Sequence, residues 1–284
     1  MLKTNNSSFI GCIDNYKEAT AVLYGAAFDS TCSFRAGTRF GPAAIRSESF
    51  GIETYSPYLD RDLTDIKVFD SGDPELPIGD TNASLKIIQK RAETILKDNK
   101  MPILIGGEHL VSLAAIKAVY KKYPNLKIVH FDAHIDFRDN YLGVKLSHSA
   151  IIRRATELIG DGKVYQFGIR SGDREEFIAA KEHGIVTQKF NFEGIEKLSE
   201  ILGNNPVYFT VDLDVLDSSV FPGTGTPEAG GVTFNELLNA TKEVSKLNVV
   251  AADIVELSPQ LDASGTSTAA ACKYLRELLL NIVK

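Results

Sequence analysis

Cysteine is scarce in this sequence, and the few cysteines present do not form pairs. The chain has three in 284 residues, at Cys12, Cys32 and Cys272, and none of them lies in a CxxC spacing. An odd number of widely separated cysteines fits no disulfide framework of a secreted protein. We therefore expect a protein of the reducing cytoplasm.

Long apolar segments are also missing. No apolar run approaches the roughly 20 residues that a helix needs to span a bilayer. Residues 1–17, MLKTNNSSFIGCIDNYK, contain neither the apolar stretch nor the cleavage site of a secretory signal. We expect neither export nor a membrane partner.

An excess of positive charge is the third absence. The chain has 31 Lys and Arg against 37 Asp and Glu, which gives a net charge of −6. Proteins that bind nucleic acids use basic surfaces to neutralise phosphates, so this balance argues against a nucleic-acid partner. It mildly favours a small cationic substrate.

The sequence does contain a regular alternation of short apolar runs and segments with helical periodicity. The expected strands are residues 20–25, 66–70, 102–107, 126–131, 164–169, 184–188, 206–214 and 247–257. The expected helices are residues 41–49, 85–97, 110–122, 149–159, 174–183, 193–202, 233–246 and the C-terminal segment.

The expected strands are continuous apolar runs rich in valine and isoleucine, which is typical of a parallel sheet covered by helices on both faces. No linker rich in Gly, Ser or Pro and no internal repeat interrupts the pattern. The sequence predicts a single domain over residues 1–284, with an α/β fold of three layers around a mostly parallel sheet of about eight strands. Ligands of such sheets bind beyond the carboxyl ends of the strands, so functional residues are expected there.

An unusual stretch, HFDAHIDFRD at residues 130–139, begins at the end of one expected strand. Its polar and apolar residues alternate strictly, so in an extended chain the polar groups would all point the same way. Burying so many carboxylates and imidazoles costs several kcal/mol each unless something compensates them. The stretch therefore requires a compensating charge.

Three expected strands end in residues of this kind. They contribute His109 after a Gly-Gly turn, Asp132, His134 and Asp136 after residues 126–131, and Asp212 and Asp214 at the end of residues 206–214. Strand ends can converge in an open α/β sheet, and these carboxylates would then repel one another without a cation. A network of ion pairs or a surface loop is the alternative for any one motif, but the three motifs together favour metal.

The donor set indicates which metal. Four carboxylates balance the charge of two divalent ions better than that of one, and paired ions are a general hydrolytic device. Oxygen and nitrogen donors without cysteine favour Mn²⁺ or another hard-to-borderline ion over a structural zinc.

These residues lie in segments that resemble the ureohydrolases, the family of arginases and agmatinases. The matching segments are GGEHL (106–110), FDAHIDFRD (131–139), VDLDVLDSSVFPGTGTPEAGG (211–231) and ADIVELSP (252–259). Three more resemble the agmatinase branch in particular: SFRAGTRFGPAAIR (33–46), ETYSPYLDRDL (53–63) and GIRSGDREE (168–176). One position departs, because many members have aspartate where this chain has Glu108, which is not a ligand in the family.

The resemblance implies two Mn²⁺ ions per chain, bridged by a hydroxide that attacks a guanidinium carbon and releases urea and an amine. The ligands implied are His109, Asp132, Asp136 and Asp212 for one ion and His134, Asp132, Asp212 and Asp214 for the other. The resemblance also implies a homo-oligomer, either a trimer or a hexamer.

Two further residues are expected in the active site. The resemblance places His148, in the loop after the metal motif, as the shuttle that gives the departing amine a proton, although an exposed loop histidine is the alternative. It places Glu256, at the end of residues 247–257, against the guanidinium, where the alternative is a plain salt bridge. We expect His130 to support the ligands without binding metal, and His183 to lie at a helix C-terminus.

The substrate follows from a difference within the family. Arginases usually carry Ser-Gly-Asn-x-His-Gly around the shuttle histidine, whose polar groups bind the α-carboxylate and α-amine of arginine. Residues 143–150 read GVKLSHSA instead, so a substrate without an α-carboxylate is favoured. Agmatine is that substrate, and putrescine and urea would be its products.

Other functions remain open at this point. Within the same chemistry, the alternative substrates are arginine, a guanidino acid and formiminoglutamate. A metal-dependent amide deacylase is a different class, but it typically uses one zinc, which needs fewer than six ligands. A binding protein without activity would be expected to have lost ligands or the shuttle, and this chain keeps them.

Overall fold

The computed structural model describes residues 7–284. The expectation that the chain starts without a secretory signal rests in part on residues 1–6, which lie outside the described residues. No helix in the described part of the chain is both long and apolar enough to cross a membrane. The three cysteines are free, as their spacing predicts.

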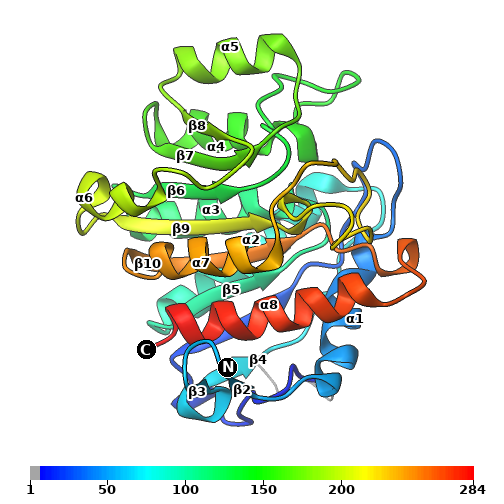
Figure 1. The fold of residues 1–284 in the computed structure, drawn as a ribbon, viewed down its shortest axis with the longest axis vertical. Coiled ribbons are helices and arrows are strands. Elements are labelled where there is room, and N and C mark those ends of the chain that lie inside the picture. The colour runs from blue at the N-terminus through cyan, green and yellow to red at the C-terminus, as the bar shows by residue number, and fades with distance from the viewer. Residues whose placement is uncertain (1–6) are drawn as a thin grey trace.

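An eight-stranded sheet forms the centre of the molecule (Figure 1). In spatial order its strands are β4 (Val68–Asp70), β1 (Ala21–Gly25), β5 (Met101–Ile105), β10 (Asn248–Val255), β9 (Pro206–Asp212), β6 (Lys127–Phe131), β7 (Val164–Ile169) and β8 (Val186–Lys189). Every neighbouring pair is parallel. The predicted parallel α/β sheet is confirmed.

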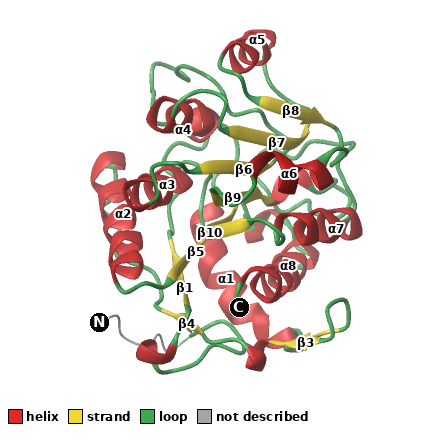
Figure 2. Ribbon diagram, turned by 90° about the vertical axis from the view of Figure 1, so that its left-hand side faces the viewer, coloured by secondary structure: helices red, strands yellow, loops and turns green. Residues whose placement is uncertain are grey.

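Helices cover both faces of the sheet, as the view along its edge shows (Figure 2). One layer consists of α2 (Thr81–Lys97), α3 (Val111–Lys122) and α4 (Ile151–Ile159). The other consists of α1 (Gly41–Glu48), α6 (Leu198–Leu202), α7 (Phe234–Val244) and α8 (Thr266–Ile282), while α5 (Arg174–Glu182) lies at the end of the sheet near β8. The predicted three layers are confirmed.

Alternate residues of each strand enter two separate apolar cores, one on each face of the sheet. In β6, Val129 and Phe131 pack in the core beneath α7 and α8, whereas Ile128 packs in the core beneath α2 and α3. Each of the three is completely buried. Because both faces of the sheet are covered, apolar residues are needed on both sides of the strand, which explains the run Ile128, Val129 and Phe131 that only the buried His130 interrupts.

Several boundaries differ from the sequence expectation. The sequence places a capping stretch, DTNAS (80–84), before the helix expected at residues 85–97. Asp80 does cap α2, by accepting a hydrogen bond from the Ala83 N–H at 2.9 Å, but the helix already begins at Thr81. Strand β9 ends at Asp212 and not at residue 214, because the Asp212 carboxylate accepts the Asp214 N–H and starts the 3₁₀ turn η7 (Leu213–Val215).

Two other elements differ as well. Residues 193–202 form the 3₁₀ turn η6 (Ile195–Lys197) followed by the short α6, where one helix was expected. The antiparallel pair β2 (Tyr55–Ser56) and β3 (Arg61–Asp62) was not expected. Strands of two residues are too short for a periodic pattern to reveal them.

The strand order brings distant segments of the chain together at one edge. Strands β5 and β6 follow one another in the sequence, but β10 and β9 lie between them in the sheet. The four central strands end on the same side, to the right in Figure 1. Their carboxyl ends therefore place residues 106–109, 132–136, 212–214 and 256 next to one another.

Candidate metal centre and active site

The loop after β5 is shaped by two glycines. A Cβ atom on Gly107 would lie 1.9 Å from the Phe28 carbonyl oxygen, and one on Gly106 would lie 2.4 Å from a methyl group of Val255. Glycine is therefore required at both positions so that the chain can pass its neighbours. The turn delivers His109 to the centre of the edge, where its backbone N–H donates to Glu256 Oε1 at 2.7 Å.

The segment after β6 departs from regular strand geometry. The strand ends at Phe131, and one isolated parallel bridge joins His134 to Ser171. Asp136 has a φ of 52°, a left-handed conformation uncommon for a residue with a side chain. The apolar members Ile135 and Phe137 are still buried, so the alternation in the sequence records burial and not an extended strand. The coiling turns Asp132 and Asp136 toward the same imidazole, that of His109.

Three carboxylates surround one nitrogen of His109. Its Nδ1 atom lies 3.0 Å from Asp132 Oδ2, 3.3 Å from Asp136 Oδ2 and 3.4 Å from Asp212 Oδ2. Among the described residues, this buried nitrogen has no partner in hydrogen-bonding geometry. A nitrogen so placed holds either a proton or a cation.

The other nitrogen of His109 is fixed by a chain of hydrogen bonds. Thr210 Oγ1 donates to Asp253 Oδ1 at 2.6 Å, so its lone pairs are left to accept the Nε2–H of His109 at 2.9 Å. This arrangement commits Nε2 as the protonated nitrogen and turns Nδ1 toward the carboxylates. Such outer partners commonly orient histidines that bind metal.

A second imidazole repeats the arrangement beside the first. His134 Nδ1 lies 2.9 Å from Asp214 Oδ2 and 3.5 Å from Asp132 Oδ1. The two oxygens of Asp132 therefore face different histidines, His109 and His134, as a bridging carboxylate requires. Asp214 Oδ2 is buried and, like His109 Nδ1, has no hydrogen-bond partner among the described residues.

The electrostatics of this cluster are unbalanced without an external cation. Burial raises the pKa of Asp136 to about 7, and the charge of Asp132 adds to the shift. Burial and the neighbouring Asp214 and Asp132 raise the pKa of Asp212 well above its usual value. Burial opposes the charge of His109 and His134, yet the surrounding carboxylates raise the pKa of both imidazoles. Asp136 and Asp212 thus tend to retain protons, whereas the neighbouring histidines lower the pKa of Asp132 although burial opposes its charge.

The donors fit a pair of divalent ions. The Nδ1 atoms of His109 and His134 each face a group of carboxylate oxygens, and Asp132 belongs to both groups. Two buried atoms of the cluster, His109 Nδ1 and Asp214 Oδ2, are without hydrogen bonds. Oxygen and imidazole ligands suit hard-to-borderline cations, so the cluster is a binuclear metal site.

His130 lies within the cluster but its nitrogens are already used. Its Nε2 atom is 2.8 Å from Asp132 Oδ2, and its Nδ1 accepts the side-chain N–H of Gln166 at 2.9 Å. Nε2 therefore carries the proton and donates it to Asp132. His130 thus orients a carboxylate of the site, in agreement with the supporting position expected for it.

A cavity of about 130 Å³ opens over the metal site. Its lining includes His134, Asp136, Asp212 and Asp214 together with the two other expected residues, His148 and Glu256. The structure therefore brings the eight predicted site residues together, since His109 and Asp132 lie directly beneath them.

His148 begins the 3₁₀ turn η5 (His148–Ala150), and its ring is fixed from one side. Nδ1 lies 2.9 Å from the Thr31 carbonyl oxygen, which can only accept, so Nδ1 carries the proton. Nε2 is left to accept from Ser33 Oγ, 3.2 Å away. Burial lowers the pKa of His148 to about 4, so the ring is neutral at pH 7.

Glu256 follows β10 in a left-handed conformation with a φ of 68°. One of its oxygens accepts the His109 N–H and the side chain is buried. Burial and the charge of Glu108 raise its pKa well above the usual value, a state that a bound cation would relieve. Two of the predicted site residues, Glu256 and Asp136, therefore have backbone conformations that cost energy, as is frequent at functional sites.

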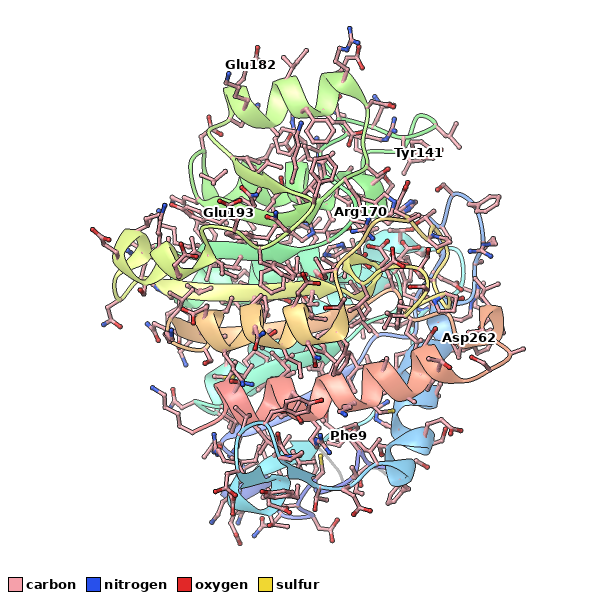
Figure 3. All side chains as sticks on the ribbon, viewed as in Figure 1. Phe9, Tyr141, Arg170, Glu182, Glu193 and Asp262 are labelled. Carbon is pink, nitrogen blue, oxygen red and sulfur yellow. The ribbon has the colours of Figure 1, made fainter. Side chains whose placement is uncertain are left out.

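The structure also shows a supporting residue that the sequence did not single out. The Arg170 guanidinium donates to backbone carbonyls on both sides of the site, including those of Asp214 at 2.7 Å and Glu228 at 2.9 Å. Figure 3 places Arg170 and Tyr141 on the side where the strands end. The position of Arg170 directly after β7 is the signal that could have identified it.

The glycine-rich segment 222–231 packs at the rim of the cavity, to which it contributes Thr226. The sequence predicts that its glycines supply turns with positive φ, but only Gly230 among them has one. The others permit close approach: a Cβ on Gly225 would lie 2.7 Å from the Arg35 carbonyl oxygen. The expectation of a positive φ was therefore wrong for three of the four glycines, Gly223, Gly225 and Gly231.

Similarity to known proteins agrees with this geometry. The profile of the arginase family matches residues 19–281. An agmatinase of Bacillus subtilis is 52% identical over 281 residues, which covers 97% of this chain and 96% of that protein. The N(1)-aminopropylagmatine ureohydrolase of Thermococcus kodakarensis is 36% identical and covers 90% and 88% of the two chains. The structure of an agmatine ureohydrolase of Thermoplasma volcanium superposes with a TM-score of 0.89 at 31% identity, over 98% of this chain and 94% of that one.

Fold and site together define a protein with a binuclear metal centre at the carboxyl edge of a parallel α/β sheet. With the matches above, the chain belongs to the arginase family. The resemblance inferred from its motifs is confirmed.

Proposed function

We propose that this protein hydrolyses agmatine to putrescine and urea with two Mn²⁺ ions per chain. The observation that carries the proposal is the pair of imidazole Nδ1 atoms, each facing carboxylates, beneath a cavity that also contains His148 and Glu256. Relatives that bear the name agmatinase support the choice of substrate.

The ligands of the proposed ions are those that the family resemblance implies, and the distances around His109 and His134 support them, except that Asp212 as a ligand of the second ion rests on the resemblance alone. One ion would be held by His109, Asp132, Asp136 and Asp212, and the other by His134, Asp132, Asp212 and Asp214. Mn²⁺ suits this mixture of carboxylate and imidazole donors. The chemistry that two such cations supply when bound is hydroxide at neutral pH, the nucleophile that the guanidinium carbon requires.

Glu256 would bind the substrate. A planar guanidinium pairs with a carboxylate through two parallel hydrogen bonds, and it would lower the pKa of Glu256 that burial and the charge of Glu108 raise. Since one Glu256 oxygen already accepts the His109 N–H, the position of the carboxylate is tied to that of a proposed ligand. Guanidinium and cations would thus be held in a fixed relation.

His148 would move the proton. Its Nδ1–H is held by the Thr31 carbonyl, so Nε2 is the nitrogen free to exchange a proton in the cavity. Hydrolysis of a guanidinium transfers both protons of one water molecule to the departing nitrogen, which leaves as an ammonium. A neutral His148 imidazole can take up the proton released when hydroxide forms and deliver it to this nitrogen, and the remaining hydroxyl proton moves to the same nitrogen as the urea carbonyl forms.

The substrate would be a cation without an α-carboxylate. Residues 143–150 offer no counterpart of the polar segment with which arginases grip that group. The net charge of −6 is compatible with a dication. Arginine, the longer aminopropylagmatine and formimino compounds are the alternatives that the test below separates.

We also propose that residues 1–284 act as one domain and assemble as a trimer or hexamer in the cytoplasm. Large apolar side chains on the surface support assembly, among them Phe34, Phe50 and Phe190, exposed by 73%, 67% and 61%. Sedimentation velocity on the Mn²⁺-loaded protein measures the state directly. A monomer at micromolar concentration would contradict assembly.

The test of function compares four substrates with the same Mn²⁺-loaded preparation. Hydrolysis of agmatine, arginine and aminopropylagmatine is measured as urea release, and hydrolysis of formiminoglutamate is measured as formamide release. We expect kcat/KM to be highest for agmatine. His148→Asn should then lower kcat about 100-fold or more while two metals per chain are retained. His183→Asn is the matched control, because His183 caps α5 and contacts Asp161, and it should leave kcat unchanged.

Each other outcome is informative. A preference for arginine would keep the metal chemistry and contradict the argument from residues 143–150. Metal at two ions per chain with no urea from any compound would contradict the guanidine substrate. Absence of bound metal would contradict the proposed centre itself.

A further inference from the structure

Glu108 is a buried glutamate beside the metal site that has no part in the function proposed so far. It precedes His109, but its carboxylate contacts a different segment, the loop after β1. Its side chain is completely buried, and a buried carboxylate is costly unless it serves a purpose or has partners. Its partners therefore indicate what it does.

Both oxygens of Glu108 bind Thr31. Oε2 accepts the Thr31 backbone N–H at 2.9 Å, and Oε1 accepts the Thr31 hydroxyl in a short hydrogen bond. The loop is also fixed to the backbone here, because the Glu108 N–H donates to the Phe28 carbonyl at 2.8 Å. Residue Thr31 is thus held in place by the side chain of Glu108.

Thr31 in turn holds His148 at two points. Its hydroxyl oxygen accepts the His148 backbone N–H at 3.1 Å, and its carbonyl accepts the ring Nδ1–H at 2.9 Å. The carbonyl contact fixes both the direction of the ring and the nitrogen that carries the proton. Among residues 7–284, the Thr31 carbonyl is the hydrogen-bond partner of Nδ1 of this ring.

We propose that Glu108 is a positioning residue for His148, acting through Thr31. The inference rests on the proposed function of His148 as proton shuttle. Glu108 orders Thr31, Thr31 fixes the tautomer and direction of the imidazole, and Nε2 consequently faces the cavity. The connection joins the segment that carries a metal ligand to the segment that carries the shuttle, which lie 40 residues apart in the chain (108 and 148).

The length of the Glu108 side chain belongs to the proposal. The carboxylate must extend from the turn after β5 to the loop that contains Thr31, and aspartate is shorter by one methylene group. Glu108→Asp should therefore lose both contacts although it keeps the charge. The chain thus requires glutamate at this position because of the loop it holds.

The first measurement is a double-mutant cycle of Glu108→Gln and His148→Asn, with kcat for urea release and bound metal as readouts. The glutamine side chain can still accept the Thr31 N–H but cannot accept the hydroxyl proton with its NH₂ group. We expect Glu108→Gln alone to lower kcat about 10- to 100-fold, with KM changed less than about threefold and two metals retained. In the His148→Asn background it should have less than about a threefold further effect.

Two variants of Thr31 test the same connection away from the metal ligands. Thr31→Val keeps the shape of the side chain and removes its hydroxyl, so it should lower kcat as Glu108→Gln does. Thr31→Ser keeps the hydroxyl and should restore most of the activity. Glu277→Gln is the control for loss of a buried glutamate, because Glu277 contacts Ser56 and Arg276 and none of the proposed site residues. This substitution should not change kcat.

Three results would overturn the proposal. An equal loss from Glu108→Gln in both backgrounds would mean that Glu108 does not act through His148. Loss of bound metal in Glu108→Gln would assign it to the metal site. Full activity in His148→Asn would remove the shuttle role itself and with it this inference, whereas the first two results leave the proposed function intact.

Discussion

Two clusters of buried charge lie at strand ends of the same sheet, and they differ in one respect. At the end of β4, Asp70 accepts two hydrogen bonds from the Arg46 guanidinium, at 2.8 and 3.0 Å. The backbone N–H groups of Phe9 and Gly72 complete its shell. At the ends of β5, β6 and β9, the carboxylates face two imidazoles and leave buried atoms without partners.

The difference separates structural charges from functional ones. A strand end is not by itself a sign of function, because the Asp70 cluster occupies one too. The chain supplies its own cation to Asp70, so that cluster is complete after folding. Among residues 7–284, no Lys or Arg side chain pairs with the carboxylates of the metal centre, so only the imidazoles face them until ions bind. The following substitutions should break the two clusters in opposite ways.

The largest effect is expected at Asp132, whose oxygens face both imidazoles. Asp132→Asn should lower kcat about a thousandfold or more and reduce bound metal below two per chain, as metal analysis by mass spectrometry would show. Normal metal content in Asp132→Asn would contradict the comparison.

Asp70→Asn should have the reverse profile. It leaves the Arg46 guanidinium buried without its full counter-charge, so the free energy of unfolding should fall by about 3–5 kcal/mol. The remaining folded protein should release urea at the normal rate. Thermal unfolding followed by circular dichroism is the suitable measurement, because urea and guanidinium resemble product and substrate. A loss of kcat without a loss of stability would refute the assignment.

Acidification should distinguish the clusters next. The carboxylates raise the pKa of His109 and His134, so in the metal-free protein these imidazoles hold protons that metal must displace. Affinity for Mn²⁺ should therefore fall as pH falls, by about tenfold per pH unit for each proton displaced. Titration calorimetry in two buffers of different ionisation enthalpy counts the protons released. Affinity that is independent of pH would exclude both imidazoles as ligands.

The smallest effect is expected at a third buried charge, Glu277, which is paired with Arg276 and accepts the Ser56 hydroxyl at 2.6 Å. Ser56→Ala removes one neutral donor from a carboxylate that keeps its cation. The free energy of unfolding should fall by about 1–3 kcal/mol without a change in kcat. Ser47→Ala, at an exposed serine with a local contact to Ala44, should leave both unchanged.

Much of this could be predicted from the sequence, because the deciding signals are local. Continuous apolar runs identified the sheet, and the proposed ligands lie at the ends of those runs: Asp132 follows β6, Asp212 is the last residue of β9, and His109 lies four residues after β5. The supporting contacts could not be predicted in this way. Thr210 meets His109 across 101 positions of the chain, a pairing that depends on the order of the strands and not on any spacing.

The errors at element boundaries have the same origin. A side chain that caps a turn competes with the strand or helix that the apolar pattern suggests. Asp80 extends α2 toward the N-terminus, whereas Asp212 ends β9 two residues early. Asp212 shows that a residue can end a strand and face His109 at once, with one oxygen for each task.

The position of β9 and β10 between β5 and β6 also has a consequence for biosynthesis. When the ribosome has synthesised β6 and the five residues after it, the chain already contains four proposed ligands: His109, Asp132, His134 and Asp136. At that stage β5 and β6 cannot yet lie at their final spacing. The two strands that separate them come from the last third of the chain, so these contacts are slow and non-local. The nascent protein therefore cannot assemble the whole centre early, and it can bind both ions only when nearly all of the chain has been synthesised.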